Sequence, residues 1–399
     1  MTRQATVVAE GLYFGEGPRW HEGRLWFSDF YDHAIKSLNP DGSIRVEVAL
    51  APPARPSGLG WLPDGRLVFS DMLARRVLRR EHDGRLVVHG DISAIATWHC
   101  NDLVVDAFGR VFIGNFGFDL DTAVADRVAG RPPTVQNTPA KLARVDLDGA
   151  VTEVAAELGF PNGTVITADH TTLIVAESFA ARLTAFTLTE NGGLTDRREW
   201  AALPGVAPDG ICIDGSGQVW VANAQGSECI LVAEGGEIIG RVETSQHTYA
   251  CMLGGADGHT LYVLTAGSSS PGAVDRQRTG RIETARVDTG AAGGWPGTPE
   301  GMFRLQPRGH AGDLAEDPDG FVHLTMGRSA VIDTANRWYR GASGDFDVLT
   351  IDQSLLDPAL LRFEQAAAGY FPHYYGTIPA AAITTRDPLR RYADGSFAG

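Results

Sequence analysis

The sequence predicts an all-β six-bladed β-propeller followed by a small α+β domain. Two observations predict the propeller: a turn-and-strand pattern that recurs through the first 290 residues, and a high content of turn-forming residues. The chain has 399 residues, of which 48 are glycine and 21 are proline, and 43% of its residues are hydrophobic. This composition is typical of many short strands that are joined by tight turns. The pattern ends near residue 290, and this predicts that a second domain follows.

The repeat is a turn followed by a strand of β-branched and aromatic residues. Its six copies are "GRLWFSD" from Gly23, "GRLVFSD" from Gly65, "GRVFIGN" from Gly109, "HTTLIVAES" from His170, "GQVWVAN" from Gly217 and "GHTLYVLTA" from Gly258. Most copies begin about 41 to 47 residues apart, which is the length of a four-stranded propeller blade. One longer interval contains residues 116–140, which we expect to be a loop insertion, either a lid or a surface excursion.

The fifth repeat shows the expected local structure. Gly215-Ser216-Gly217 separates two apolar runs, and glycine supplies the backbone torsions of a tight hairpin. We therefore expect Ile211–Ile213 and Gln218–Ala222 to pair as antiparallel strands. "RIETARVDTG", residues 281–290, is expected to form the last outer strand of the propeller.

A polar residue stands about eight positions before five of the six turns. The equivalent residues are Glu16, Ser57, Asn101, Asn162, Asp209 and Ala250. Equivalent positions of successive blades form a ring around the channel of a propeller. Five of the six carry short oxygen-bearing side chains, so the ring is a candidate site for a hard cation. A single Asp-Gly or Asn-Gly pair would indicate only a turn, and it is the repetition that favours a metal site.

Composition and missing motifs exclude several classes of protein. The net charge of −15 and the pI near 5.1 argue against nucleic acid as a partner. No signal peptide and no membrane-spanning apolar run are evident, so we expect a cytoplasmic protein that does not bind membranes. The four isolated cysteines are expected to be buried free thiols. The sequence has no G-x-S-x-G elbow, zinc-protease motif, phosphate loop or dinucleotide fingerprint.

Four motifs resemble one family. "GEGPRW", "CNDLVVDAFGRVFIGN", "PNGTVI…LIVAES" and "PDGICIDGSGQVWVAN" are similar, in order and spacing, to the senescence marker protein 30, gluconolactonase and luciferin-regenerating enzyme family. The resemblance covers about residues 8–290. It implies a six-bladed propeller with one catalytic divalent metal ion, bound by Glu16, Asn162 and Asp209. It also implies that Asn101 lies near the substrate, and that the substrate is a sugar lactone.

One departure from the family concerns substrate recognition. Members that act on sugar acids often carry an arginine two residues before the position of Asn101, where this chain has His99. A neutral imidazole would bind a polyhydroxy lactone differently, so His99 is a candidate either for the pocket or for a structural role. Asn115, at the end of "GRVFIGN", is a further candidate for the pocket, although such asparagines are often turn residues.

The residue types suggest a hydrolytic chemistry. Two carboxylates and a carboxamide favour calcium first, then magnesium or manganese, with zinc still open. A divalent ion would polarise an ester carbonyl and activate water, and Asp209 would accept the proton. The prediction is therefore a metal-dependent lactonase that opens a lactone or ester.

Three alternatives stay open. The same site could hydrolyse phosphotriesters or fluorophosphates, or could catalyse a non-hydrolytic step of a biosynthetic pathway. The propeller could also be a calcium-stabilised scaffold without catalysis. The sequence leaves the oligomeric state undetermined.

The last hundred residues form a different unit. A linker is predicted at residues 291–301, and domains at residues 1–290 and 302–399. "GFVHL", an acid after a short strand and "FPHYYG" resemble a bacterial family of unknown function, number 952, over about residues 302–390. The resemblance implies an α+β fold similar to that of ADP-ribosyltransferases. Its polar residues are His323, Glu364 and His373, and we expect the histidines to be buried and bonded to backbone. We expect one helix near residues 329–339 and do not predict NAD binding.

Overall fold

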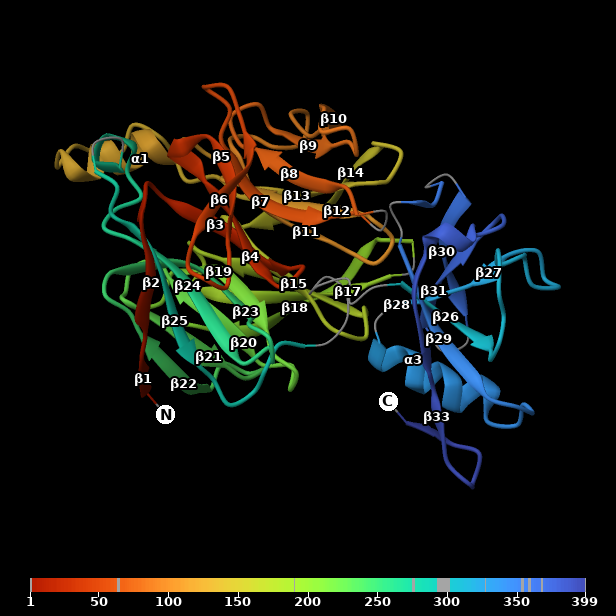
Figure 1. The fold of residues 1–399 in the computed structure, drawn as a ribbon. Coiled ribbons are helices and arrows are strands. Elements are labelled where there is room, and N and C mark those ends of the chain that lie inside the picture. The colour runs from red at the N-terminus through yellow and green to blue at the C-terminus, as the bar shows by residue number, and fades with distance from the viewer. Residues whose placement is uncertain are drawn as a thin grey trace. The chain divides into compact units, whose positions relative to one another are not determined.

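The computed structural model divides the chain into two compact units (Figure 1). It describes residues 2–62, 65–189, 191–274, 277–292, 302–326, 328–352, 355–357, 360–366 and 369–398. The first unit comprises Met1–Trp61 with Arg66–Ala292, and the second comprises Gly293–Gly399 with Leu62–Gly65. Residues 293–301 of the predicted linker lie outside the described residues. Ala291 forms an isolated bridge with Asp214 and therefore belongs to the first unit.

The described part of the first unit contains six antiparallel sheets built from consecutive strands. They are β3–β6 (Gly15–His21, Arg24–Asp29, Ala34–Leu38, Ile44–Ala49), β7–β10 (Pro56–Trp61, Leu67–Asp71, Arg76–Arg80, Leu86–Asp91), β11–β14 (Cys100–Val105, Val111–Asn115, Ala140–Val145, Val151–Leu158), β15–β18 (Pro161–Ile166, Thr172–Glu177, Arg182–Leu188, Leu194–Ala202), β19–β22 (Pro208–Ile213, Val219–Asn223, Glu228–Val232, Ile238–Glu243) and β23–β25 (His247–Gly254, Thr260–Ala266, Gly280–Arg286). The second strand of each sheet lies in one of the six predicted repeats. The predicted hairpin of the fifth repeat is confirmed, with Ile211 opposite Val221.

The N-terminal segment completes two of these sheets. β2 (Thr6–Leu12) pairs antiparallel with β25, and β1 (Thr2–Gln4) pairs parallel with β22. The expectation that residues 281–290 form an outer strand was therefore wrong. β25 lies between β24 and β2, because the start of the chain returns to cover its edge. This pairing joins the two ends of the first unit and closes the succession of sheets.

The first strands of the six sheets form a closed series. β3 contacts β7, and the contacts continue through β11, β15, β19 and β23 back to β3. The strands approach closely at a position where five of the six carry glycine or alanine. A Cβ at Gly58 would lie 2.2 Å from the backbone nitrogen of Leu103, and one at Gly163 would lie 2.5 Å from the carbonyl oxygen of Asp209. Glycine is required at these positions because no side chain fits between the strands.

Antiparallel order places several loops beside the starts of the first strands. In each sheet the first strand begins where the second ends, so the loops that follow the second strands lie at the same face. These loops include the 3₁₀ turn at Phe30–Asp32 and the predicted insertion, which contains helix α1 (Leu120–Val128). α2 (Pro271–Val274) follows β24 in the same way. This face therefore collects the irregular segments around the predicted ring.

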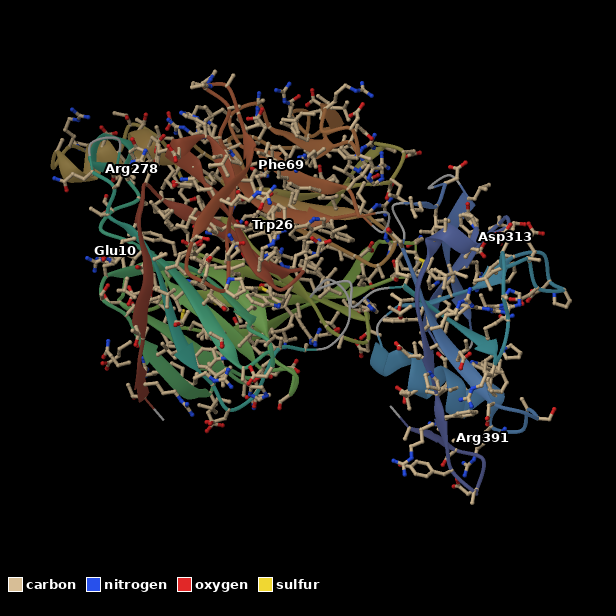
Figure 2. The ribbon with its side chains drawn as sticks, in the orientation of Figure 1. Glu10, Trp26, Phe69, Arg278, Asp313 and Arg391 are labelled. Atoms are coloured by element: carbon tan, nitrogen blue, oxygen red, sulfur yellow. The ribbon has the colours of Figure 1, made fainter. Side chains whose placement is uncertain are left out.

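Apolar side chains fill the space between neighbouring sheets. Trp26 and Phe69, labelled in Figure 2, are 6% and 0% exposed. The four cysteines, Cys100, Cys212, Cys229 and Cys251, are free and buried, as expected. Cys212 and Cys251 lie close together, with their sulfur atoms 3.8 Å apart.

The second unit is a small mixed structure with its own core. One sheet has the order β28 (Thr325–Met326), β26 (Met302–Pro307), β29 (Phe346–Ile351) and β32 (Ile383–Pro388), and another has β27 (Val322–His323), β31 (Gly369–Tyr374) and β30 (Leu361–Ala366). β33 (Arg390–Arg391) pairs with β34 (Phe397–Ala398). The predicted helix is confirmed as α3 (Arg328–Thr334), which continues as a π-helical turn at Ala335–Tyr339.

A substitution at Gly58 tests the close approach of the first strands. Gly58→Ala places a methyl group against backbone atoms of β11, which cannot move as a side chain can. We expect the free energy of unfolding to fall by about 3 kcal/mol. Gly272→Ala is the control, since a Cβ there has no described atom within 4 Å. Equal stability of the two variants in urea unfolding would contradict the proposed packing.

A buried histidine makes the first unit sensitive to acid. His21 stacks on Trp61 with ring centroids 3.8 Å apart, and burial, followed by the charge of Arg24, lowers its pKa to about 3. The unfolded chain therefore takes up a proton below about pH 6.5 that the folded chain does not, and stability is lost as the pH falls from 6.5 towards 3. We expect His21→Phe to reduce this loss by up to about 1.4 kcal/mol per pH unit, measured by urea unfolding. The exposed His82→Gln serves as control, and identical pH slopes for wild type and His21→Phe would refute the explanation.

Candidate functional site

Each first strand is irregular at the predicted ring position. In β11·β12 the register shifts between Cys100 and Leu103, and the other five first strands shift at the equivalent place. A bulge leaves the extra residue outside the ladder and re-aims its side chain. The repeated bulge leaves Ser57, Asn101, Asn162 and Asp209 outside the ladder, whereas Glu16 stays paired with Ser28 beside its bulge.

The sixth place of this ring belongs to a residue that sequence reasoning missed. In β23·β24 the shift lies between Thr248 and Ala250, so Tyr249 occupies the bulge. Ala250 instead takes the position of the glycines that separate the first strands, since a Cβ on Gly210 would lie 2.7 Å from its Cα. The expectation that Ala250 completes the ring was therefore wrong by one residue, because the alignment of the repeats could not show the bulge.

The ring residues are buried and several are in contact. Glu16 is 5%, Asn101 3%, and Asn162 and Asp209 are each 8% exposed. The Nδ2 of Asn101 donates to the Oδ1 of Asn162 at 3.1 Å, and the Nδ2 of Asn162 donates to the Oγ of Ser178 at 3.2 Å. The structure thus brings together residues that are 193 positions apart in the sequence, from Glu16 to Asp209.

Two carboxylates of the ring repel each other. Burial raises the pKa of Glu16 well above its ordinary value, and the charge of Asp209 is the next cause. Burial also raises the pKa of Asp209 well above its ordinary value, with a further contribution from Asp102, and the Asn162 carboxamide opposes this. Both groups are thus costly to ionise in the protein alone.

Asp102 is a third buried acid, and it was not among the predicted site residues. It occupies the position of the separating glycines, is 4% exposed, and accepts from Ser57 Oγ at 3.4 Å. Burial raises its pKa, while the charge of Arg19 opposes the shift. Arg19 donates to the carbonyl oxygens of Pro18 and Leu103. The signal was available in the sequence, because this repeat alone carries an acid where four others have glycine.

The donor set fits a divalent cation. Oxygen atoms of Glu16, Asn162 and Asp209 are hard ligands of the kind that calcium and magnesium take. The Oδ1 of Asn101 is buried without a hydrogen-bond partner among the described residues, and such an atom needs a polar contact. The causes of the raised pKa values are burial and like charge, and a cation would offset both.

Asn115, a predicted candidate for the pocket, forms hydrogen bonds with the loop that follows β12 and with the next strand. Its Oδ1 accepts from the backbone nitrogen of Gly117 at 3.0 Å, and its Nδ2 donates to the carbonyl oxygen of Lys141 at 2.8 Å. It is one of six buried polar residues at equivalent ends of the second strands, Asp29, Asp71, Asn115, Glu177, Asn223 and Thr265. Glu177, for example, accepts from the backbone nitrogen of Gly159 and pairs with Arg182. These side chains fasten the loops that surround the ring.

His99 lies at the edge of the site beside the insertion. It is half-buried, its ring centroid lies 5.9 Å from that of Phe116, and Phe116 stacks on Phe160 at 4.7 Å. Burial lowers the pKa of His99, and the charge of Asp121 on the insertion is the largest opposing cause. His99 is therefore a neutral imidazole in an aromatic wall at neutral pH.

The second unit holds a separate polar cluster that includes the three predicted residues. His323 contacts Asp317 through Nδ1 at 2.8 Å and Asp319 through Nε2 at 3.3 Å. Ligand atoms of these three residues lie within 4.8 Å of one another, which is a spacing that a metal ion could use. Asp317 already accepts from Arg304 at 2.6 Å. Burial would raise the pKa of Asp317, but its bonds to His323 and the charge of Arg304 hold it below the ordinary value.

The histidines of this cluster bond to carboxylates. His373 Nδ1 and Tyr375 Oη each lie 2.7 Å from the Oε2 of Glu364. His373 stacks on Phe321 at 4.0 Å and lies 5.3 Å from the ring of His323. The expectation of imidazoles bonded to backbone was therefore wrong for both side chains, and the expectation of burial holds only for His373, which is 6% exposed.

Buried oxygen-bearing side chains near the starts of the first strands form a candidate divalent-metal site. Residues 14–267 match the SMP-30/gluconolactonase/LRE-like region, and the chain belongs to this family. Residues 302–386 match a family described as a protein of unknown function (DUF952).

Curated relatives cover most of the first unit. Pentonolactonase XacC of Haloferax volcanii is 30% identical over 72% of this chain and 94% of its own length. Regucalcin of Danio rerio is 28% identical over 65% of this chain and 85% of its own.

Solved structures support the fold. A luciferin-regenerating enzyme superposes with a TM-score of 0.59 at 19% identity, covering 73% of this chain and 98% of the other. A gluconolactonase of Xanthomonas campestris gives 0.55 at 22% identity, over 70% and 89%. The described chain contains no helix long and apolar enough to cross a membrane.

Removing one ring carboxylate tests the electrostatic account. In chelator-treated protein at pH 8, we expect Asp209→Asn to leave the melting temperature unchanged or raise it, because it relieves repulsion with Glu16. Added Ca²⁺ should raise the melting temperature of the wild type by several degrees and that of the variant by less. Calorimetry at both conditions measures this.

The matched control is a buried carboxylate that already has a cation. Asp106 accepts from the Nε of Arg110 at 2.6 Å and from two backbone nitrogens, so Asp106→Asn should lower stability with or without Ca²⁺. Equal Ca²⁺ stabilisation of wild type and Asp209→Asn would count against a cation at the ring.

Proposed function

We propose that the chain is a metal-dependent lactonase whose first unit is a six-bladed β-propeller. The pair of buried carboxylates, Glu16 and Asp209, is the main support for this proposal, because burial and like charge make both costly to ionise without a cation. The carboxamides of Asn101 and Asn162 add further oxygen atoms to the ring. The lactonase names of relatives that share the first unit support lactones as the substrate class. We propose domains at residues 1–290 and 302–399, joined by a linker at residues 291–301 whose first two residues pack with the first unit.

Three ring residues are proposed as metal ligands. Glu16, Asn162 and Asp209 hold one divalent ion, with calcium the first candidate and magnesium, manganese or zinc as alternatives. The hydrogen bond from Asn162 Nδ2 to the Ser178 hydroxyl orients the Asn162 carboxamide. Its Oδ1 accepts one hydrogen bond from Asn101 and keeps a second lone pair with which it could bind the ion. When bound, the ion would supply Lewis-acid activation of the ester carbonyl and of water.

The protein's own groups would complete the hydrolysis. The Asp209 carboxylate accepts the proton of the attacking water, for which a raised pKa is an advantage in a general base. Asn101 offers a buried carboxamide oxygen without a protein partner to the substrate or to a water molecule. His99 contributes a neutral imidazole to the wall of the pocket. The free thiols accord with a cytoplasmic location.

The second unit keeps a narrower proposal. We propose an α+β fold similar to that of ADP-ribosyltransferases, which its small sheets and the helix α3 support. The contacts of His323, Glu364 and His373 do not indicate which ligand this cluster would bind. We therefore assign no activity to this unit.

A metal-resolved hydrolysis assay tests the lactonase. Protein stripped with chelator receives Ca²⁺, Mg²⁺, Mn²⁺ or Zn²⁺, and acid release is followed on sugar, aliphatic and aromatic lactones. We expect turnover only with a divalent ion, and a fall in kcat on the order of 10²-fold or more in Asp209→Asn. Metal binding without turnover of any lactone would reject the lactonase and favour a scaffold or a biosynthetic step. Turnover of phosphotriesters alone would favour that alternative.

A further inference from the structure

A second tier of side chains lies above the ring. Alternate residues of an extended strand share a face, so a residue two positions before a ring residue lies on the same side of its strand. These residues are Phe14, Arg55, His99, Ala207 and His247, whereas Phe160, which precedes Asn162, has a φ of 62° and departs from the extended pattern. The backbone confirms the extension at two of them. Met72 donates to the carbonyl oxygen of Arg55 at 2.9 Å, and Phe116 donates to that of His99 at 2.9 Å, which continues the ladders of β7 and β11.

Arg55 is the arginine of this tier, and its guanidinium lies beside two other groups of the same face. It stands 4.8 Å from the ring centroid of Tyr31, which belongs to the turn after β4. Its charge also reaches His99 on the neighbouring first strand, since it contributes to lowering the pKa of that imidazole after the larger effects of burial and of Asp121. Arg55, at the start of the second sheet, therefore lies near one group that follows β4 of the first sheet and one that precedes β11 of the third.

The Nε of Arg55 has no hydrogen-bond acceptor among the described residues. This Nε is buried, and a buried N–H without an acceptor is costly. The neighbouring cation Arg75 is engaged, since it donates to the carbonyl oxygen of Ala96 at 3.1 Å. Asp119 of the insertion accepts from both the backbone and the hydroxyl of Thr122. An arginine in this state is suited to a planar anion, which it binds through two parallel hydrogen bonds.

The distance between the tiers sets the kind of substrate. Two residues of an extended strand span about 6.6 Å. A lactone carbonyl at the ring of Glu16 and Asp209 would therefore place an anionic group at the far end of a five- or six-carbon chain near Arg55. His99, as a neutral imidazole, can donate one further hydrogen bond to the same group.

We propose that Arg55, with His99 beside it, is the specificity-determining subsite for a carboxylate or phosphate at the far end of the lactone. This inference rests on the proposed lactonase function. It makes the preferred substrate an anionic sugar lactone, and it distinguishes Arg55 from the metal-binding residues, whose loss would affect every substrate.

The test compares substrates that differ in charge at the far end. Full-length protein, with the divalent ion that supports turnover, is assayed on D-glucaro-1,4-lactone for a carboxylate, 6-phosphoglucono-1,5-lactone for a phosphate and glucono-1,5-lactone as the neutral analogue. We expect the wild type to prefer at least one anionic lactone by 10-fold or more in kcat/KM. Arg55→Gln should lose 10- to 100-fold on that lactone, mainly through KM, and less than 3-fold on the neutral one. Arg55→Lys should restore part of the loss, and Arg75→Gln should behave as wild type.

The outcomes separate this inference from the lactonase itself. Hydrolysis of the neutral lactone with no preference for either anionic one overturns the subsite and leaves the lactonase intact. An equal loss on neutral and anionic lactones in Arg55→Gln also overturns it, because that indicates a structural role. If no lactone is hydrolysed, the lactonase fails, and calorimetry with glucarate and 6-phosphogluconate decides the subsite. Binding that Arg55→Gln weakens at least 10-fold supports the subsite, and absence of binding by the wild type overturns it.

Discussion

The close approach of the six first strands is the constraint on which the site depends. Gly58 and Gly163 leave no room for a side chain between neighbouring strands, and the strands can therefore meet in a closed series. Packing of this kind moves the bulged residue just before each small residue towards its neighbours. A wider series would separate Glu16 from Asp209, and their charges would no longer influence each other. The fold thus creates the site by controlling how near the strands can come.

The same closeness has an electrostatic cost that the protein does not offset alone. Glu16, Asp102 and Asp209 are all buried, and each has a raised pKa because burial opposes its charge. The charge of Arg19 acts most strongly on Asp102. It stabilises the ionised forms of the two ring carboxylates less. Buried like charges usually mark a place where a cation or a proton is handled. This links the architecture to metal binding more directly than the presence of any one acidic residue.

The parts of the structure that could be predicted are those with a repeated local signal. Turns like that at Gly215–Gly217 recur along the chain, and polar residues such as Asn162 and Asp209 precede them at a nearly fixed spacing. The sheets and most of the ring positions could therefore be predicted from the sequence. The role of Tyr249 did not, because a bulge adds one residue without changing the pattern of apolar positions. The return of β2 onto β25 was missed for a different reason, since pairing between distant segments carries no local signature. Asp102 was overlooked although its repeat visibly departs from the glycine pattern.

In the second unit, short-range motifs identified the polar residues and long-range contacts determined their partners. His323 and His373 face each other because β27 and β31 pair, and the carboxylates that hold them come from outside the two motifs or from another strand. The cluster of Asp317, Asp319 and His323 provides a second possible cation site in the same chain. Metal binding by the whole protein therefore does not identify the site. The position of the bound ion shows which of the two units holds it.

Anomalous diffraction from crystals soaked in Mn²⁺ tests the central claim most directly. The account predicts one strong peak among the oxygen atoms of Glu16, Asn162 and Asp209, with further positions open to water. A peak only at Asp317, Asp319 and His323, or no peak at the ring, would contradict it.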